Sequence, residues 1–110
     1  MEERLRRIGE NEALFRQINE RVKEVSESFS LVLDKAEFLC ECGEATCTER
    51  VTVELADYER VRSSPTRFIV RPGHVLPEVE TIVEQTPGYD VVEKQVGEAA
   101  RLAEQTDPRG

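Results

Sequence analysis

The stretch Phe38-Leu39-Cys40-Glu41-Cys42-Gly43-Glu44-Ala45-Thr46-Cys47 holds all three cysteines of this 110-residue chain. The one histidine, His74, follows Pro72-Gly73 further along the chain. Three thiols and one imidazole make a complete tetrahedral ligand set for zinc, an ion with no geometric preference of its own. The sequence therefore predicts one Zn²⁺ held by Cys40, Cys42, Cys47 and His74, and the rest of the chain is interpreted around that site.

The spacing of these residues suits a metal knuckle. Cys40 and Cys42 lie two apart, so on an extended strand both side chains point to the same face. Gly43 follows at once and accepts the positive φ that a tight turn back requires. Pro72-Gly73 is a turn dipeptide that can present His74 toward the thiols. If His74 is not a ligand, the fourth position falls to a water, a second chain, or one of the carboxylates Glu41, Glu44 and Glu49.

Two other interpretations of the cysteines are open. They could be buried core thiols, or one disulfide with one free thiol. Clustering within eight residues beside a glycine favours a metal site over core packing. The sequence shows no signal peptide, so we expect a cytoplasmic, reducing compartment, in which a stable disulfide is disfavoured.

The pattern Cys40-x-Cys42-Gly43-x3-Cys47 resembles the zinc-binding post-SET segment of SET-domain methyltransferases. That likeness covers eight residues and implies a zinc knuckle whose fourth ligand comes from elsewhere in the fold, not methyl transfer. A longer pattern, from Phe38 through Asp57-Tyr58-Glu59 to Pro72-Gly73-His74, resembles small uncharacterised actinobacterial proteins with three cysteines and one histidine. This second resemblance covers most of the chain and implies no known activity.

A helix is expected over residues 11–28, with Asn11 as its N-cap. Its apolar residues recur at steps of three and four and so mark one face: Leu14, Phe15, Ile18, Val22, Val25 and Phe29. Charged residues fill the opposite face. The apolar face is expected to cover a small sheet, to dock a partner or a second copy, or to do both.

The remaining elements are read from period-two alternation and from proline and glycine breaks. Strands 36–42 and 50–55 are expected to form an antiparallel hairpin with the metal loop at its tip. A short helix over 56–63 and a strand over 68–70 return His74 to that loop. Residues 79–86 fit a helix or a strand; a hairpin with 89–95 is preferred.

The predicted fold class is α+β, with a long N-terminal helix packed on a small antiparallel sheet and a zinc knuckle at a hairpin tip. One domain is expected, because the chain is short and only 38% hydrophobic. A structural metal would offset so small a core. Residues 1–10 are expected to be a flexible N-terminus, 11–96 the zinc-stapled domain, and 97–110 a frayed or disordered acidic tail.

Charge limits the classes of partner. The net charge is −8, which argues against nucleic acid and anionic membranes, and no apolar run is long enough to span a bilayer. One local exception is the set Arg60, Arg62, Arg67 and Arg71, which could bind phosphate or nucleic acid. The preferred interpretation is that these arginines pair with the many glutamates.

The sequence predicts a protein that is not an enzyme. Three thiolates and a histidine close the zinc shell and activate water poorly, and Glu41 is expected to be a solvated loop carboxylate. The predicted function is a structural-zinc module for protein interaction or regulation, with a redox or zinc-release switch as the alternative. Homodimerisation through the N-terminal helix is one expectation, and the candidate partner-binding residues are Phe15, Ile18, Val22, Tyr58 and Arg62.

Overall fold

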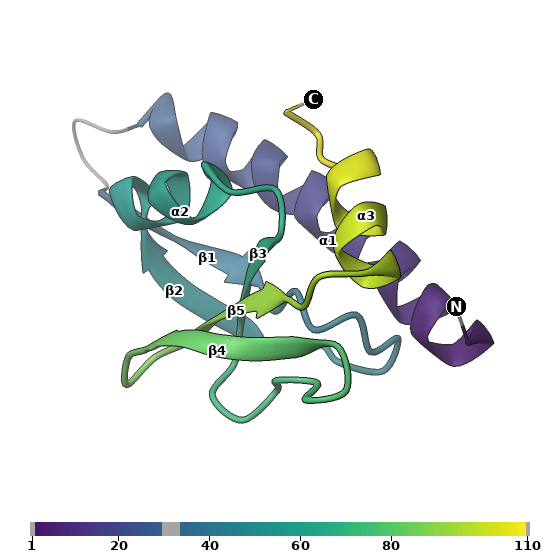
Figure 1. Cartoon of the computed structure of the whole chain (residues 1–110). Coiled ribbons are helices and arrows are strands. Elements are labelled where there is room, and N and C mark those ends of the chain that lie inside the picture. Colours follow the sequence, from purple (N-terminus) through teal and green to yellow (C-terminus); the bar gives the residue numbers. More distant parts are fainter. Residues whose placement is uncertain (1, 30–33, 110) are drawn as a thin grey trace.

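The computed structural model describes residues 2–29 and 34–109. Within them the chain forms three helices and five strands, in the order α1 (Glu3–Glu27), β1 (Lys35–Leu39), β2 (Arg50–Glu54), α2 (Leu55–Arg62), β3 (Arg67–Val70), β4 (Glu80–Gln85), β5 (Asp90–Lys94) and α3 (Glu98–Gln105). Figure 1 shows α1 running diagonally above the strands, with α3 in front of its N-terminal half. The predicted α+β layout, a long N-terminal helix on small antiparallel sheets, is confirmed.

The strands form two small sheets rather than one. β1 and β2 make an antiparallel hairpin, and β3, β5 and β4 make an antiparallel sheet in that order. The expected hairpin of 79–86 with 89–95 is present as β4 and β5. A backbone hydrogen bond of 2.8 Å from the Glu41 amide to the Ile69 carbonyl joins the first hairpin to the second sheet. The metal loop therefore lies where the two sheets meet.

The main hydrophobic core draws on both sheets and on α2. The rings of Phe38 and Tyr58 stack with centroids 4.2 Å apart. Around them lie buried residues from β2, α2, β3 and β5, namely Val51, Val53, Val61, Ile69 and Val91. Because β2 alternates, its valines are buried while its intervening residues are exposed.

The inward face of α1 differs from the expected one. Its buried residues are Ile8, Glu12, Arg16 and Asn19. Three residues of the apolar stripe that was expected to cover the sheet are instead exposed, by 52%, 41% and 54%: Leu14, Ile18 and Val25. The prediction assumed that apolar side chains decide which face is buried. Here polar side chains take that face because each finds partners inside.

Arg16 shows how a charged side chain is accommodated on the inward face. Its guanidinium donates to the backbone carbonyls of Pro65 and Ala103, at 2.6 and 2.7 Å. It also lies 4.5 Å from the centroid of the Phe68 ring, at a cation–π distance. Burial lowers the pKa of Arg16 from its usual range. This one side chain nevertheless ties α1 to β3, to the segment before β3 and to α3.

Both ends of the described chain are more regular than the sequence predicted. α1 begins at Glu3 and passes through Gly9, where a Cβ would lie 2.5 Å from a methyl of Leu102. Glycine at this position therefore permits α3 to approach α1 closely. α3 buries Ala100 and Ala103, and Asp107 beyond it forms an ion pair with buried Arg62. The segments 1–10 and 97–110 were expected to be flexible or frayed; in the structure their described residues belong to the folded unit.

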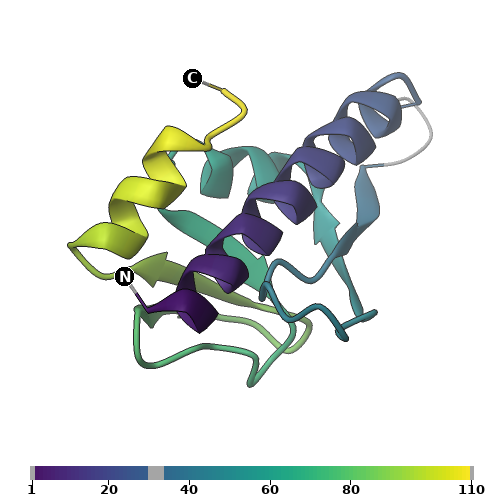
Figure 2. The ribbon, with the colours of Figure 1, turned by 90° about the vertical axis from the view of Figure 1, so that its right-hand side faces the viewer.

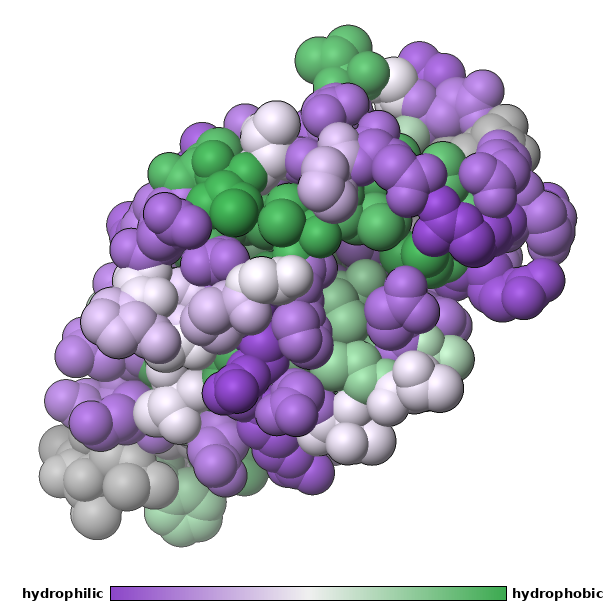
Figure 3. All heavy atoms as spheres, turned by 90° about the horizontal axis from the view of Figure 1, so that it is seen from below, coloured by the Kyte–Doolittle hydropathy of each residue, from purple (hydrophilic) through white to green (hydrophobic). Residues whose placement is uncertain are grey.

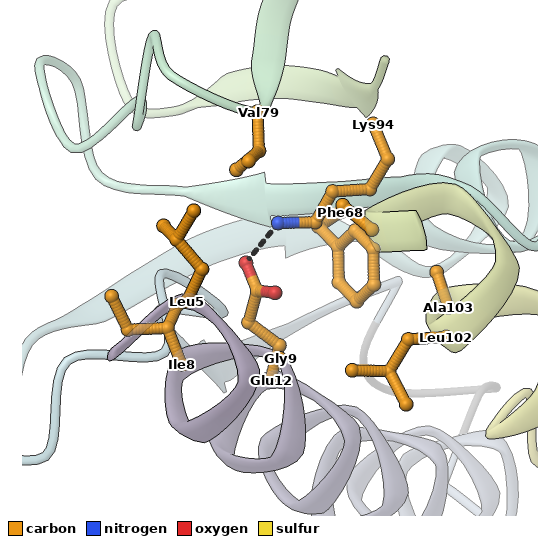
Figure 4. Close-up of a pocket in the computed structure, with 10 residues that line it drawn as sticks. Leu5, Ile8, Gly9, Glu12, Phe68, Val79, Lys94, Leu102 and Ala103 are labelled. Carbon is orange, nitrogen blue, oxygen red and sulfur yellow. Dashed lines mark hydrogen bonds and ion pairs between the residues drawn. The ribbon is translucent and has the colours of Figure 1, made fainter. Parts of the chain in front are cut away.

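A second buried cluster of charges lies between α1, β4 and β5. The ammonium of Lys94 is 2.7 Å from a carboxylate oxygen of Glu12 and 2.8 Å from one of Glu80. Figure 4 shows Glu12 and Lys94 joined across a small pocket lined by apolar side chains, including Phe68 and Leu102. Two carboxylates share one cation here. Burial raises the pKa of Glu12 to about 8; the charge of Lys94 opposes this shift, and the charge of Glu80 adds to it.

This raised pKa predicts that the protein loses stability as pH rises. The pKa of Glu12 is about 8 in the folded chain against 4.5 for the free group, so the folded state binds more protons than the unfolded state between these values. The free energy of unfolding should fall with pH across that window, by up to about 1.4 kcal/mol per unit from this group. Urea unfolding from about pH 6 to about pH 8.5 measures this slope.

Glu12→Gln removes the titration and keeps the side-chain shape. We expect the free energy of unfolding of this variant to change less with pH than that of the parent protein. The two free energies should be closest at the acidic end of the range. Glu37→Gln, at an exposed position of β1, is the matched control and should keep the parent slope. Identical slopes for all three proteins would contradict the prediction.

β4 is the open edge of the three-stranded sheet, since it pairs with β5 alone. Its Ile82 and Val83 are each 38% exposed. Seen from below, the side on which β4 lies, the molecule shows a band of hydrophobic side chains against a largely polar remainder (Figure 3). The register of β4 shifts between Ile82 and Glu84, a bulge that interrupts the regular edge and hinders addition of a further strand.

No helix in the described part of the chain is long and apolar enough to cross a membrane.

Candidate metal centre

The four predicted ligands converge on one point. The sulfurs of Cys40, Cys42 and Cys47 and a ring nitrogen of His74 all lie within 4.8 Å of one another. Nδ1 of His74 is 3.5 Å from the Cys40 sulfur and 3.8 Å from the Cys47 sulfur. The chain positions joined in this way are up to 34 residues apart, so the fold and not local sequence brings the imidazole to the thiols.

These spacings can be tested against zinc. With Zn–S about 2.3 Å and Zn–N about 2.0–2.1 Å, tetrahedral coordination places two sulfurs about 3.8 Å apart and a sulfur about 3.6 Å from a ring nitrogen. The two sulfur–nitrogen distances, 3.5 and 3.8 Å, match this requirement. The donor set is also the one that zinc prefers among the common divalent ions. These two distances therefore fit a tetrahedral Zn²⁺ bound through Nδ1, and all four ligand atoms are close enough to hold one metal ion.

Backbone turns set the positions of the ligands. The Cys40 amide donates to the Glu49 carbonyl at 3.0 Å, which closes the loop beyond the last β1–β2 pair. The Cys47 amide donates to the Glu44 carbonyl, and the His74 amide to the Arg71 carbonyl, both at 3.0 Å. Each of these two bonds spans three residues, so each ligand is presented from a tight turn.

Gly43 forms the turn that the sequence predicted, and it also lets the loop approach α1 closely. Its φ of 81° lies in the left-handed region that glycine enters freely. A Cβ at this position would also lie 2.6 Å from Ile8 and 2.7 Å from Glu12, so the knuckle touches the inward face of α1. Asn11 donates from its side chain to the Gly43 carbonyl at 2.9 Å. The loop is thus fastened to the helix directly after the second thiol.

The thiols have unequal proton affinities in this geometry. Hydrogen bonding from Cys40 lowers the pKa of Cys42 to about 5, helped by a bond from the Glu44 amide. That same hydrogen bond raises the pKa of Cys40, and burial raises the pKa of Cys47. The Arg71 amide donates to the Cys40 sulfur at 3.2 Å and delocalises thiolate charge. Of the three thiols, Cys42 therefore gives up its proton most readily, and proton loss is what metal binding requires of a cysteine.

Glu41 lies between two ligands but points away from them. It is fully buried, not the solvated carboxylate that the sequence indicated. One oxygen accepts from Asn19 at 2.8 Å and from the Tyr58 hydroxyl at 2.9 Å, and the other accepts from the Ile69 amide at 3.0 Å. These donors belong to α1, α2 and β3, so the carboxylate joins three elements in the interior. Burial raises the pKa of Glu41, and the bonded donors lower it.

The other carboxylates considered as a fourth ligand are placed as follows. Glu44 is exposed on the loop, and Glu49 is 3.6 Å from the guanidinium of Arg71. Together with Thr46 and Thr48 they line a hollow at the surface beside Cys42, Cys47 and His74. Cys47 and His74 are partly exposed there, whereas Cys40 and Cys42 are buried. The hollow offers an ion a route to the site.

The candidate partner residues are scattered through the structure. Ile18 is exposed, Phe15 is half-buried, and half-buried Val22 packs against the main core. Tyr58 and Arg62 are only 0% and 1% exposed, with partners inside the fold. A docking surface in this conformation therefore cannot include them.

Each arginine of the candidate phosphate-binding set faces a carboxylate. Arg60 pairs with Glu84, Arg67 with Glu93 and Arg71 with Glu49. Buried Arg62 pairs with Asp107. The interpretation that these arginines pair with acidic residues is supported at every position, which leaves a phosphate-binding cluster without support.

Sequence reasoning missed the residues that hold the knuckle in place, chiefly Asn19 and Asn11. Asn19 donates to the Leu39 carbonyl and accepts from the Leu39 amide, so it caps the end of β1. A usable signal was present: Asn11, Glu12, Arg16 and Asn19 recur at helical spacing, as residues of one face do.

Comparison with protein-family models, with curated proteins and with solved structures gave no match to this chain.

Proposed function

We propose that this chain is a small non-enzymatic protein in which Zn²⁺ is structural and that it serves as a protein-interaction or regulatory module. The observation that supports this most strongly is the convergence of three sulfurs and one imidazole nitrogen within 4.8 Å of one another, with two sulfur–nitrogen distances of 3.5 and 3.8 Å. A catalytic zinc keeps one position open and needs a base nearby. The carboxylate closest in sequence, Glu41, is buried and bonded to three donors from other elements.

Metal analysis of the purified protein tests the site. We expect one zinc per chain, and a loss of at least tenfold in zinc affinity for Cys47→Ser and for His74→Ala, since each removes one of four ligands. Thr48→Ser, which leaves the ligand set intact in the same loop, is the matched control and should bind zinc as the parent does.

Full zinc occupancy with unchanged affinity in both ligand variants would overturn the assignment. If only Cys47→Ser lost zinc affinity, the cysteines would remain as ligands and His74 would not be one. The fourth ligand would then be Glu44, Glu49 or water. The resemblance to small actinobacterial proteins with three cysteines and one histidine stays a prediction, and the zinc measurement does not depend on it.

A redox switch is the second candidate, favoured by the partial exposure of Cys47 beside two buried thiols. Two zinc-bound thiolates would be oxidised to a disulfide while peroxide takes both electrons and two protons to give two waters, and Zn²⁺ would be released. Zinc release under dilute peroxide, without loss of the remaining fold, is the result that distinguishes a switch. Release only under denaturing conditions indicates purely structural zinc.

A further inference from the structure

The outer face of α1 carries apolar residues that nothing in the described structure covers. Leu14, Ile18 and Val25 are 52%, 41% and 54% exposed. Figure 2 shows α1 lying across this side of the molecule with α3 beside it and no element over it. The helix buries Glu12, Arg16 and Asn19 on its inward face while these three aliphatic side chains stay on its outer face, where they are free to pack against another surface.

Two charged residues on the same face indicate what kind of surface would complement it. Glu10 lies four residues before Leu14, and Arg21 lies three residues after Ile18; both are exposed. When a second α1 runs antiparallel with its Ile18 over Leu14, its Arg21 falls beside Glu10. Two-fold symmetry repeats the contact, so one register gives two apolar contacts and two opposite-charge contacts.

The alternative arrangement is disfavoured by the same charges. In a parallel pair, Glu10 would face Glu10 and Arg21 would face Arg21, and like charges at such positions repel. Val25 in the antiparallel register lies opposite Arg7 of the other copy, whose methylene stem can cover it. Arg7 and Glu10 have no ion-pair partner among residues 2–29 and 34–109, so both can turn to a second chain.

We propose that the outer face of α1 is a self-association surface, on which a second copy of this chain packs α1 against α1 in an antiparallel pair centred on Leu14 and Ile18. The surface is separate from the zinc site, and the proposal does not rest on the proposed function. It deepens the sequence-based expectation of a homodimer by fixing the residues, the direction and the register.

Sedimentation analysis of the zinc-loaded protein and of charge variants tests this. The parent protein should show a monomer–dimer equilibrium. Glu10→Arg and Arg21→Glu should each weaken self-association by about tenfold or more, because each turns two attractive contacts into two repulsive ones. Leu14→Glu should abolish it. All of these residues are exposed, so the fold, checked by circular dichroism, should be unchanged.

Mixing gives the deciding measurement. The Glu10→Arg and Arg21→Glu proteins should form a heterodimer more readily than either forms a homodimer, because both contacts of the mixed pair join opposite charges, whereas both contacts of each homodimer join like charges. The double variant should recover the homodimer, because both of its contacts again join opposite charges. A parent protein that stays monomeric throughout, a dimer that ignores the single reversals, or a double variant that does not associate would each overturn the proposal.

Discussion

Removal of zinc from the purified protein is expected to unfold the β1–β2 hairpin and most of the fold that depends on it. Structural zinc in small domains contributes roughly 10–16 kcal/mol, which is as large as the whole stability of a typical domain, about 5–15 kcal/mol. The loss should therefore appear as a disappearance of the cooperative melt, not as a small shift. Circular dichroism and thermal unfolding before and after chelation provide the measurement.

The position of the ligand loop in the fold is the reason for expecting so large an effect. Residues 44–46 and 48–49 of the loop are exposed, so little apolar burial holds its tip. Its sulfurs, however, sit in a second core cluster with Phe68, Val70, Val92 and Ala103. An ion bound to these sulfurs would therefore fix the point at which the first hairpin, the second sheet and α3 meet, and its loss would expose all three.

Two controls separate metal loss from other effects of the chelator. Adding zinc back should restore the melt of the parent protein. The Thr48→Ser protein, loaded with zinc and then chelated, should lose and regain its melt in the same way. A parent protein with the same melting curve before and after complete removal of zinc would exclude a structural role for the ion.

The parts of the fold that could be predicted are those in which local pattern and burial agree. β2 alternates apolar and polar residues, and its two valines are buried as the period-two pattern requires. The clustering of the four candidate ligands could be predicted from residue chemistry, because they are the only thiols and the only imidazole of this chain and zinc favours both. Glycines mark the turns of both ligand loops: Gly43 and Gly73 adopt positive φ, at 81° and 85°.

The parts that could not be predicted depend on contacts between distant segments. α3 was expected to fray because it has little apolar surface, yet Ala100 and Ala103 are buried since Gly9 lets the two helices approach. The orientation of α1 was missed because Arg16 and Glu12 find their partners 87 and 82 residues away. Hydrophobic periodicity cannot indicate such burial of charge, since the partners that offset its cost lie outside the window being read.

Glu41→Ala is expected to destabilise the folded protein by roughly 3–5 kcal/mol. The change leaves the Tyr58 hydroxyl and the Ile69 amide buried without an acceptor and takes one bond from Asn19; each unsatisfied buried group costs about 1–3 kcal/mol. Because this one carboxylate joins α1, α2 and β3 at the level of the metal loop, no neighbouring side chain can replace it. Urea unfolding of the zinc-loaded protein measures the loss.

Two further variants show whether the effect belongs to the network or to the loop. Glu44→Ala removes an exposed carboxylate from the same loop and should change stability by less than about 0.5 kcal/mol. Glu41→Gln keeps the shape but turns one acceptor into a donor that faces a donor, so an intermediate loss is expected. Zinc stoichiometry should stay at one ion per chain in all three, because Glu41 points away from the sulfurs. If Glu41→Ala were as stable as Glu44→Ala, the carboxylate would not be what joins the helices to the knuckle, and the metal alone would have to account for their packing.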